Sequence, residues 1–304
     1  MLSPEAFVTE LEPVVADLLD RHLAKSKEWF PHEVVPWSRG RDFERGASWT
    51  TDDSDVELSA ELRSALFVNL LTEDNLPYYF RTIERTFGPD GAWGEWNRRW
   101  TAEEGRHSIA IRDYLTVTRA VDPVWLERAR MAQVSCGQVP EPQSPQDGIA
   151  YVALQELATR IAHHNTGKLI DDPAGREVLK RVAVDENHHH LFYRDLVTAA
   201  LQIDPSGMVT AIERQVKDFE MPGTGIVDFV AHAKAIAAAG IYDFQIHHDD
   251  ILQAVVVRHW ALADVQGLDD EGKAAQAGTL RHIERVGKAA KRLSRRRDAE
   301  PALA

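Results

Sequence analysis

The sequence contains two short stretches of the form Glu-x-x-His, EGRH at 104–107 and ENHH at 186–189. On an α-helix, residues three positions apart lie on nearly the same face, so each stretch can direct a carboxylate and an imidazole to one point. Both stretches interrupt rows of apolar residues with helical spacing, so their polar side chains should point into the core. The first row is Trp93, Trp96, Trp100, Glu104, His107 and Ile111, and the second is Leu179, Val182, Glu186, His189, Tyr193 and Leu196.

Two further glutamates lie on apolar helical rows, each about one helical hairpin upstream of these stretches. Glu73 precedes Glu104 by 31 residues, and Glu156 precedes Glu186 by 30 residues. Burying an unpaired carboxylate is costly, so each glutamate needs a hydrogen-bonded cation or a metal ion as a partner. The sequence therefore contains the same arrangement twice, a Glu followed one hairpin later by Glu-x-x-His.

This repeated arrangement is the ligand set of ferritin-like bundles that hold two iron or two manganese ions. A single inward Glu or His is usually an ion-paired or hydrogen-bonded core residue, but two matched copies favour a metal site. Four carboxylates and two neutral imidazoles suit iron, with manganese as a substitute, and their charge balances two divalent ions. The predicted ligands are Glu73, Glu104, His107, Glu156, Glu186 and His189.

Helical periodicity dominates the whole chain, and strand-like alternation is scarce. We predict an all-α fold, a ferritin-like four-helix di-iron bundle with additional helices, in one domain over 1–304. Pro77, four residues after Glu73, predicts a local kink, because it cannot donate the helical hydrogen bond to the Glu73 carbonyl. An irregular segment is expected over about 30–52. The predicted helices are 4–24, 56–87, 93–118, 123–135, 146–168, 173–200, 206–219, 226–240, 243–262 and a basic C-terminal helix over 269–297.

Composition excludes several classes of protein. The 304 residues carry 48 acidic and 35 basic side chains, and this net charge of −13 disfavours binding to nucleic acid. No apolar stretch is long enough to span a membrane, and the N-terminus lacks the pattern of a signal peptide. The one cysteine, Cys136, cannot form an internal disulfide. These features predict a protein of the reducing cytoplasm.

Several stretches beyond the predicted ligands resemble one known family. They are PHEVVPW at 31–37, TEDNLPYY at 72–79, WTAEEGRH at 100–107, QELAT at 155–159, NTGK at 165–168 and DENHH at 185–189. Together they resemble the soluble acyl-[acyl-carrier-protein] desaturases, and most closely their actinobacterial branch, over about 10–260. One departure is Gly105, where the family usually has Asn, and it leaves the ligand spacing intact.

The resemblance implies a homodimeric helical enzyme that uses dioxygen to insert a cis double bond into an acyl chain carried on acyl carrier protein. It implies that a ferredoxin supplies electrons, and that the six predicted ligands hold two iron ions. It further implies that Thr159 lies beside the oxygen-binding face. Asp185 and Trp29 match an acid that supports a ligating histidine and a tryptophan that passes electrons through His107.

Three other functions stay open at this point. One is a related di-iron oxygenase that hydroxylates or N-oxygenates another substrate, which the mass of the product would distinguish from a desaturase. Another is non-catalytic iron binding or storage, which fits this long chain poorly because storage monomers need about four long helices. A radical-generating reductase subunit is the last, and it would show a tyrosyl radical signal.

The C-terminal stretch reverses the charge of the chain. Residues 281–297 contain eight basic residues and one acidic residue. Such a basic row is usually a solvated helix face. We hypothesise that the row formed by Arg281, Arg285, Lys288, Arg292 and Arg295–Arg297 helps to dock an acidic carrier protein.

Overall fold

The computed structural model describes residues 2–137, 139, 141–223 and 225–299. Within these ranges the chain forms helices and no strand, which confirms the predicted all-α class. The longer helices are α1 (Pro4–Lys25), α3 (Ala60–Glu73), α4 (Leu76–Phe87), α5 (Gly91–Val117), α6 (Pro123–Cys136), α7 (Pro145–Leu169), α8 (Pro173–Ile203), α9 (Pro205–Lys217), α10 (Phe229–Ala238) and α12 (Asp270–Ala299).

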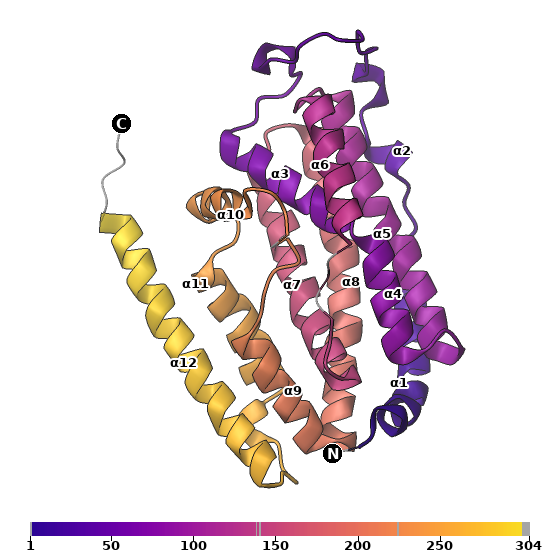
Figure 1. Ribbon diagram of the computed structural model, residues 1–304, viewed down its shortest axis with the longest axis vertical. Coiled ribbons are helices and arrows are strands. Elements are labelled where there is room, and N and C mark those ends of the chain that lie inside the picture. Colours follow the sequence, from indigo (N-terminus) through magenta and orange to yellow (C-terminus); the bar gives the residue numbers. More distant parts are fainter. Residues whose placement is uncertain (1, 138, 140, 224, 300–304) are drawn as a thin grey trace.

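Two helical hairpins form the central four-rod bundle (Figure 1). The first hairpin consists of α3 and α4, which together make one rod, followed by α5, and the second consists of α7 and α8. Helix α1 packs on α5 and α8, whereas α9 packs on α7 and α8 and is itself flanked by α12. The predicted ferritin-like bundle with additional helices is therefore confirmed, and each of its rods can supply side chains to a common centre.

Local sequence explains why the second hairpin begins its helices where it does. Ser144 and Asp172 stand just before α7 and α8, and their side-chain oxygens accept hydrogen bonds from backbone N–H groups of the first turn at 3.2 and 3.0 Å. Such caps satisfy N–H groups that have no partner inside the helix. Pro145 and Pro173 occupy the first helical positions, where a missing N–H costs nothing.

The single helix predicted over 56–87 was wrong, because the chain forms two helices there. Helix α3 ends at Glu73 and α4 begins at residue 76. Pro77 cannot donate to the Glu73 carbonyl, so the expected kink becomes a complete break. The ion pair of Asp74 with Arg130 of α6, 2.6 Å long, fixes the broken turn in place. Glu73 therefore ends its helix at the centre of the bundle.

The predicted helix over 243–262 was right in its position but not in its type. A short α11 (Phe244–Ile246) continues into a π-helix, η3 (His247–His259), whose wider turn the sequence did not predict. The Trp260 N–H donates to the Val255 carbonyl five residues earlier, at 2.8 Å, which is the π-helical pattern. Helix α12 packs against both η3 and α9.

The remaining predictions concern segments outside the bundle. The irregular segment over 30–52 contains only the short α2 (Pro31–Val34) and single turns, as expected. Cys136 is an exposed free thiol. In the described ranges, no helix combines the length and the apolarity that crossing a bilayer requires.

Candidate metal centre

Six buried carboxylate and imidazole side chains from the four rods meet at the centre of the bundle. They form two overlapping groups, and within each group the potential ligand atoms lie within 4.8 Å of one another. Glu104 and Glu186 belong to both groups. All six predicted ligands are thus brought together. The groups are Glu73, Glu104, His107 and Glu186 on one side, and Glu104, Glu156, Glu186 and His189 on the other.

The two imidazoles direct the same ring nitrogen, Nδ1, at carboxylates of the cluster. His107 Nδ1 lies 3.2 Å from Glu104 Oε2 and 3.3 Å from Glu186 Oε1. His189 Nδ1 lies 2.7 Å from Glu104 Oε1 and 3.7 Å from Glu156 Oε2. Each Glu-x-x-His stretch therefore presents its carboxylate and its imidazole on one helix face, as the spacing predicted.

The opposite ring nitrogen of each histidine faces an acid outside the cluster. His107 Nε2 lies 3.3 Å from Asp185 Oδ2, and His189 Nε2 lies 3.0 Å from Glu103 Oε2. An acid at Nε2 favours the neutral tautomer with its proton on Nε2, which leaves a lone pair on Nδ1. In that tautomer both lone pairs point into the cluster, as metal coordination requires.

Several polar atoms of the cluster lack a hydrogen-bond partner among the described residues. They are Nδ1 of His107 and of His189, Oε1 of Glu104 and Oε2 of Glu156. Buried polar atoms normally have a hydrogen-bond partner, so four such atoms without a partner at one point require an explanation. The donor set of carboxylate oxygens and imidazole nitrogens fits iron or manganese, and two divalent ions would satisfy these atoms together.

The electrostatics of the cluster also fit displacement of protons by metal. Burial raises the pKa of Glu104 and of Glu156, and the charge of Glu186 raises both further. Burial opposes charge on the imidazoles, yet the Glu104 carboxylate outweighs it and raises the pKa of His107 and of His189 well above the ordinary value. Without metal, protons therefore balance the buried carboxylates, and divalent ions must displace them on binding.

Trp29 and Asp185 lie next to His107, on the outer side of its ring. The Trp29 indole Nε1 donates to Asp185 Oδ2 at 2.8 Å, and its ring stacks on the His107 ring with centroids 6.5 Å apart. Arg106 secures this group, because it donates to Asp185 at 2.8 Å and to the Trp29 carbonyl at 3.2 Å. Trp29, Asp185 and His107 contact one another in turn, so they connect the segment after α1 to the cluster.

Glu103 and His22 form a similar group on the His189 side, and the sequence reasoning missed both. Glu103 Oε2 contacts His189 Nε2 at 3.0 Å and His22 Nε2 of α1 at 2.9 Å. A signal was available, because Glu103 directly precedes one ligand glutamate just as Asp185 precedes the other. The partner of that acid could not be found from spacing, because His22 comes from a distant helix.

His163 is another buried neighbour of the cluster to which the sequence reasoning gave no role. Its Nε2 lies 2.9 Å from Glu73 Oε1. Burial would raise the pKa of Glu73, but hydrogen bonds with His107 and His163 outweigh it and hold that pKa below its usual range. His163 lies two helical turns after Glu156, on the same apolar row. That position was the signal for a residue beside the centre.

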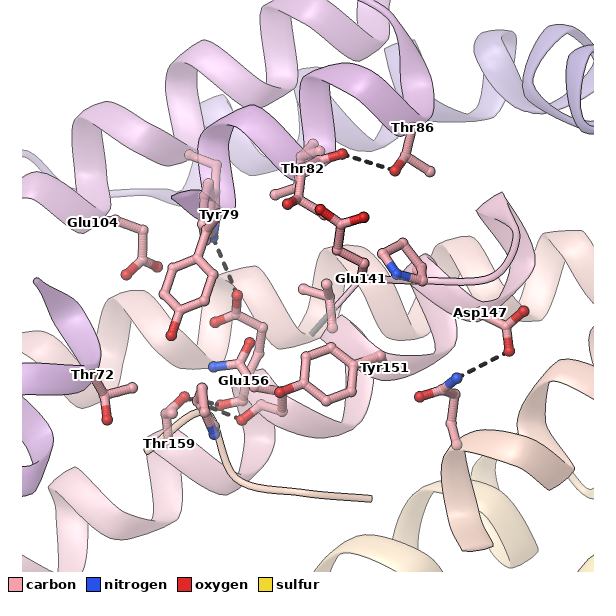
Figure 2. Close-up of a pocket in the computed structure, with 18 of the residues that line it drawn as sticks. Thr72, Tyr79, Thr82, Thr86, Glu104, Glu141, Asp147, Tyr151, Glu156 and Thr159 are labelled. Carbon is pink, nitrogen blue, oxygen red and sulfur yellow. Dashed lines mark hydrogen bonds between the residues drawn. The ribbon is translucent and has the colours of Figure 1, made fainter. Parts of the chain in front are cut away.

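A pocket of about 890 Å³, including its open mouth, extends to the cluster. In Figure 2, Glu104, Glu156 and Thr159 lie toward one end of it, and Asp147 lies toward the other. Thr159 Oγ1 donates to Glu186 Oε2 at 2.8 Å, so this hydroxyl links the pocket wall to the cluster. The four glutamates of the cluster all line the pocket, so whatever fills it lies against them.

A second cavity, of about 640 Å³, lies on the other side of Glu73 between α3, α7 and α10. Its lining is mostly apolar and includes Ala65, Val68 and Ala162. Both cavities are lined by Thr72, Glu73 and Thr159, so these residues form a common wall beside the cluster.

Comparison with known proteins agrees with this geometry. Residues 5–304 match the family model described as fatty acid desaturase. The chain is 43% identical over 273 residues to a Mycobacterium tuberculosis protein provisionally named acyl-[acyl-carrier-protein] desaturase DesA1, covering 86% of this chain and 80% of DesA1. The chain belongs to the acyl-[acyl-carrier-protein] desaturase family.

More distant relatives place this chain in a wider group. It is 32% identical over 278 residues to the chloroplastic stearoyl-[acyl-carrier-protein] 9-desaturase 6 of Arabidopsis thaliana, covering 85% of this chain and 70% of that protein. The X-ray structure of Mycobacterium tuberculosis DesA2, provisionally named an acyl-ACP desaturase, superimposes with a TM-score of 0.70 at 30% identity. That match covers 89% of this chain and 99% of the DesA2 chain. Family and fold therefore agree, and the buried Glu and His groups fit the di-iron type of site.

Proposed function

We propose that this protein is a dioxygen-dependent desaturase that inserts a cis double bond into an acyl chain carried on acyl carrier protein. The observation that best supports the proposal is the pocket that ends against the cluster. Its wall includes Glu73, Glu104, Glu156 and Glu186. A substrate in this pocket would therefore lie against the groups proposed to bind metal.

The proposed metal ligands are the six buried side chains, which would hold two iron ions, and Glu104 and Glu186 belong to both groups of potential ligands. Bound iron supplies the oxidising chemistry, in which dioxygen removes two hydrogens from neighbouring methylene groups. The protein's own contribution is to hold the reacting methylenes close and to exclude water. The proposed role of Thr159 is to hold a proton at Oγ1 beside this face, where it donates to Glu186.

Two cavities that adjoin the cluster on either side of Glu73 suit a chain that is attacked in its interior. A long acyl chain has carbons on both sides of the new bond, and both parts need apolar space. The larger pocket would receive one part and the cavity between α3, α7 and α10 the other. A substrate attacked at its end would need only one of these cavities.

The electron balance requires an external donor. Reduction of dioxygen to two waters takes four electrons, and removal of two hydrogens from the chain supplies two of them. We propose that a ferredoxin-type protein supplies the other two. The contact from Trp29 through Asp185 to His107 is the proposed route, because it joins the segment after α1 to the cluster.

Two further parts of the proposal rest on the sequence alone, the first on the family resemblance and the second on the single cysteine, Cys136. They are a homodimeric assembly and a location in the cytoplasm. Sedimentation of the purified chain tests the first, and fractionation of the source cells tests the second.

Aerobic turnover of a panel of carrier-bound acyl chains with reduced ferredoxin, followed by mass spectrometry, tests the proposed reaction. The expected product is two hydrogens lighter than its substrate. A product that is one oxygen heavier would instead support the related oxygenase. If no chain in the panel loses hydrogen, the desaturase proposal fails.

A further inference from the structure

The outward face of α12 is a row of cations on an otherwise acidic protein. Arg281, Arg285, Lys288 and Arg292 are exposed and follow one another at intervals of four, three and four residues. They lie opposite the face that buries Ile283 and Ala290. The row spans about 16 Å, because a helix rises 1.5 Å per residue. We refer to these four residues as the basic face.

Most of the basic face is free to meet a partner. Lys288 pairs with Glu284 on the same helix. Among the residues that the structure describes, Arg281, Arg285 and Arg292 make no hydrogen bond or ion pair. An exposed intramolecular pair is worth little, so even Lys288 can exchange its partner at small cost.

Helix α9 contacts α12, which carries the basic face, and also contributes to the wall of the larger pocket. Helix α9 runs along α12, and a Cβ atom at Gly278 of α12 would lie 3.9 Å from Lys217 Nζ at the end of α9. Gln215, two residues earlier in α9, lines the pocket, and so does Pro222, in the segment that follows α9. Glu141, with an exposed side chain, and Gln215, half-buried, mark the open end of the pocket.

The segment after α9 contacts both the pocket wall and η3, on which α12 packs. Tyr151, which lines the pocket, donates to the Glu220 carbonyl at 3.2 Å and packs on Phe219 with ring centroids 5.9 Å apart. Phe219 also stacks on His247 of η3, at 4.8 Å. The segment after α9 is therefore held by α7 on one side and by η3 on the other.

Acidic residues near the mouth are largely compensated. Glu213 pairs with Lys217, and Asp147 accepts from Arg214 at 2.7 Å. Asp218 is an exposed acid of the segment after α9, as is Glu220. The three unpaired arginines of the basic face outnumber these two acids. Since the whole chain has a net charge of −13, this face is where an acidic protein could approach without strong repulsion.

We propose that the basic face, together with the C-terminal end of α9, is the docking surface for an acidic acyl carrier protein that delivers its acyl chain into the larger pocket. This inference rests on the proposed function and adds where the carrier binds. Complementary charge chiefly accelerates association and weakens as salt screens it. Binding at this surface should therefore be fast and sensitive to salt.

The test measures binding of stearoyl-loaded bacterial acyl carrier protein to the wild-type chain and to the triple variant Arg281→Glu, Arg285→Glu, Arg292→Glu. The expected result is a rise in Kd of about tenfold or more at low salt, with a flatter salt dependence. The matched control is Arg45→Glu, Arg128→Glu, Lys168→Glu, which changes the net charge equally at exposed positions elsewhere. An unchanged Kd in the first variant, or an equal rise in the control, overturns the proposal.

Turnover of the wild-type chain separates this proposal from the proposed function. If the wild type binds the carrier through the basic face but desaturates no acyl chain, the proposed function fails and the docking surface stands. If the wild type desaturates and the triple variant binds as well as the wild type, the docking surface fails alone. Should the triple variant not fold by circular dichroism, Arg285→Glu and Arg285→Gln, measured over a salt series, replace it.

Discussion

The His107 and His189 halves of the candidate centre are built alike but connected differently. In each half, the residue just before a ligand glutamate is an acid that contacts the outer nitrogen of the histidine from the other hairpin. On the His107 side this acid, Asp185, accepts from the indole of Trp29, whereas on the His189 side Glu103 contacts His22. Both acids can orient an imidazole, but only one of them joins it to an indole. The comparison separates a supporting role, common to both halves, from an electron-transfer role that we assign to one.

The largest expected effect comes from removing a carboxylate that both halves share. Glu186→Ala should lower bound iron from about two ions per chain to well below one and abolish turnover. Glu73→Ala touches one half and should leave about one ion. Metal analysis of reconstituted protein checks both values. Equal iron content in the two variants would contradict the assignment of Glu186 to both groups.

The next effect tests whether the two outer acids support their histidines equally. Asp185→Asn and Glu103→Gln should each weaken iron binding or activity by about 10–100-fold, because partners that orient a ligating histidine contribute on that scale. Competition with a metal chelator measures the affinity. A loss of iron affinity in only one variant would show that the two acids do not support their histidines equally.

A smaller effect, on the rate of reduction, should distinguish Trp29 from His22, which occupies the corresponding place in the other half. Trp29→Phe should slow reduction by reduced ferredoxin about tenfold while iron content stays unchanged, since the ring remains but its hydrogen bond to Asp185 is lost. The matched control, His22→Gln, should leave this rate unchanged. Stopped-flow reduction measures the rate, and dithionite serves as a donor that needs no protein route. Equal slowing in both variants would argue against a route through Trp29.

The smallest expected effect is on the number of protons that the protein releases when it binds iron. The carboxylates raise the pKa of His107 and of His189 well above the ordinary value, so both rings are protonated in the metal-free protein near neutral pH. Iron needs the neutral ring, so its affinity should rise as the pH rises toward these pKa values. In Asp185→Asn the pKa of His107 should fall, because the Asp185 hydrogen bond helps to raise it. Calorimetric titration should then show a fractional decrease in the protons released, and an unchanged release would contradict this assignment.

Short-range patterns predicted much of the site and of the fold. The three-residue spacing within each Glu-x-x-His stretch, and the apolar rows around them, depend only on helical geometry, which is local. The matched distances from Glu73 and Glu156 to those stretches reflect hairpins of similar length. For these reasons the four rods and the six converging side chains could be predicted before any coordinates.

The parts that sequence reasoning missed depend on contacts between distant segments. Glu103 meets His22 across 81 residues, and no periodicity relates the two. The break after Glu73 was predicted only as a kink, because Asp74 and its partner Arg130 are 56 residues apart. The π-helical turns of η3 similarly arise where η3 packs on its neighbours, since the local sequence does not distinguish them from α-helical ones.

The common wall of the two cavities, formed by Thr72, Glu73 and Thr159, has a consequence for regiochemistry. For an acyl chain that occupies both spaces, the position of these three residues fixes which carbons lie against the cluster. The depth of one space sets how many carbons precede that part of the chain, and the depth of the other sets how many follow it. Filling the space between α3, α7 and α10, for example with Ala162→Phe, should therefore shift the preferred chain length without moving the bond as counted from the end held in the larger space.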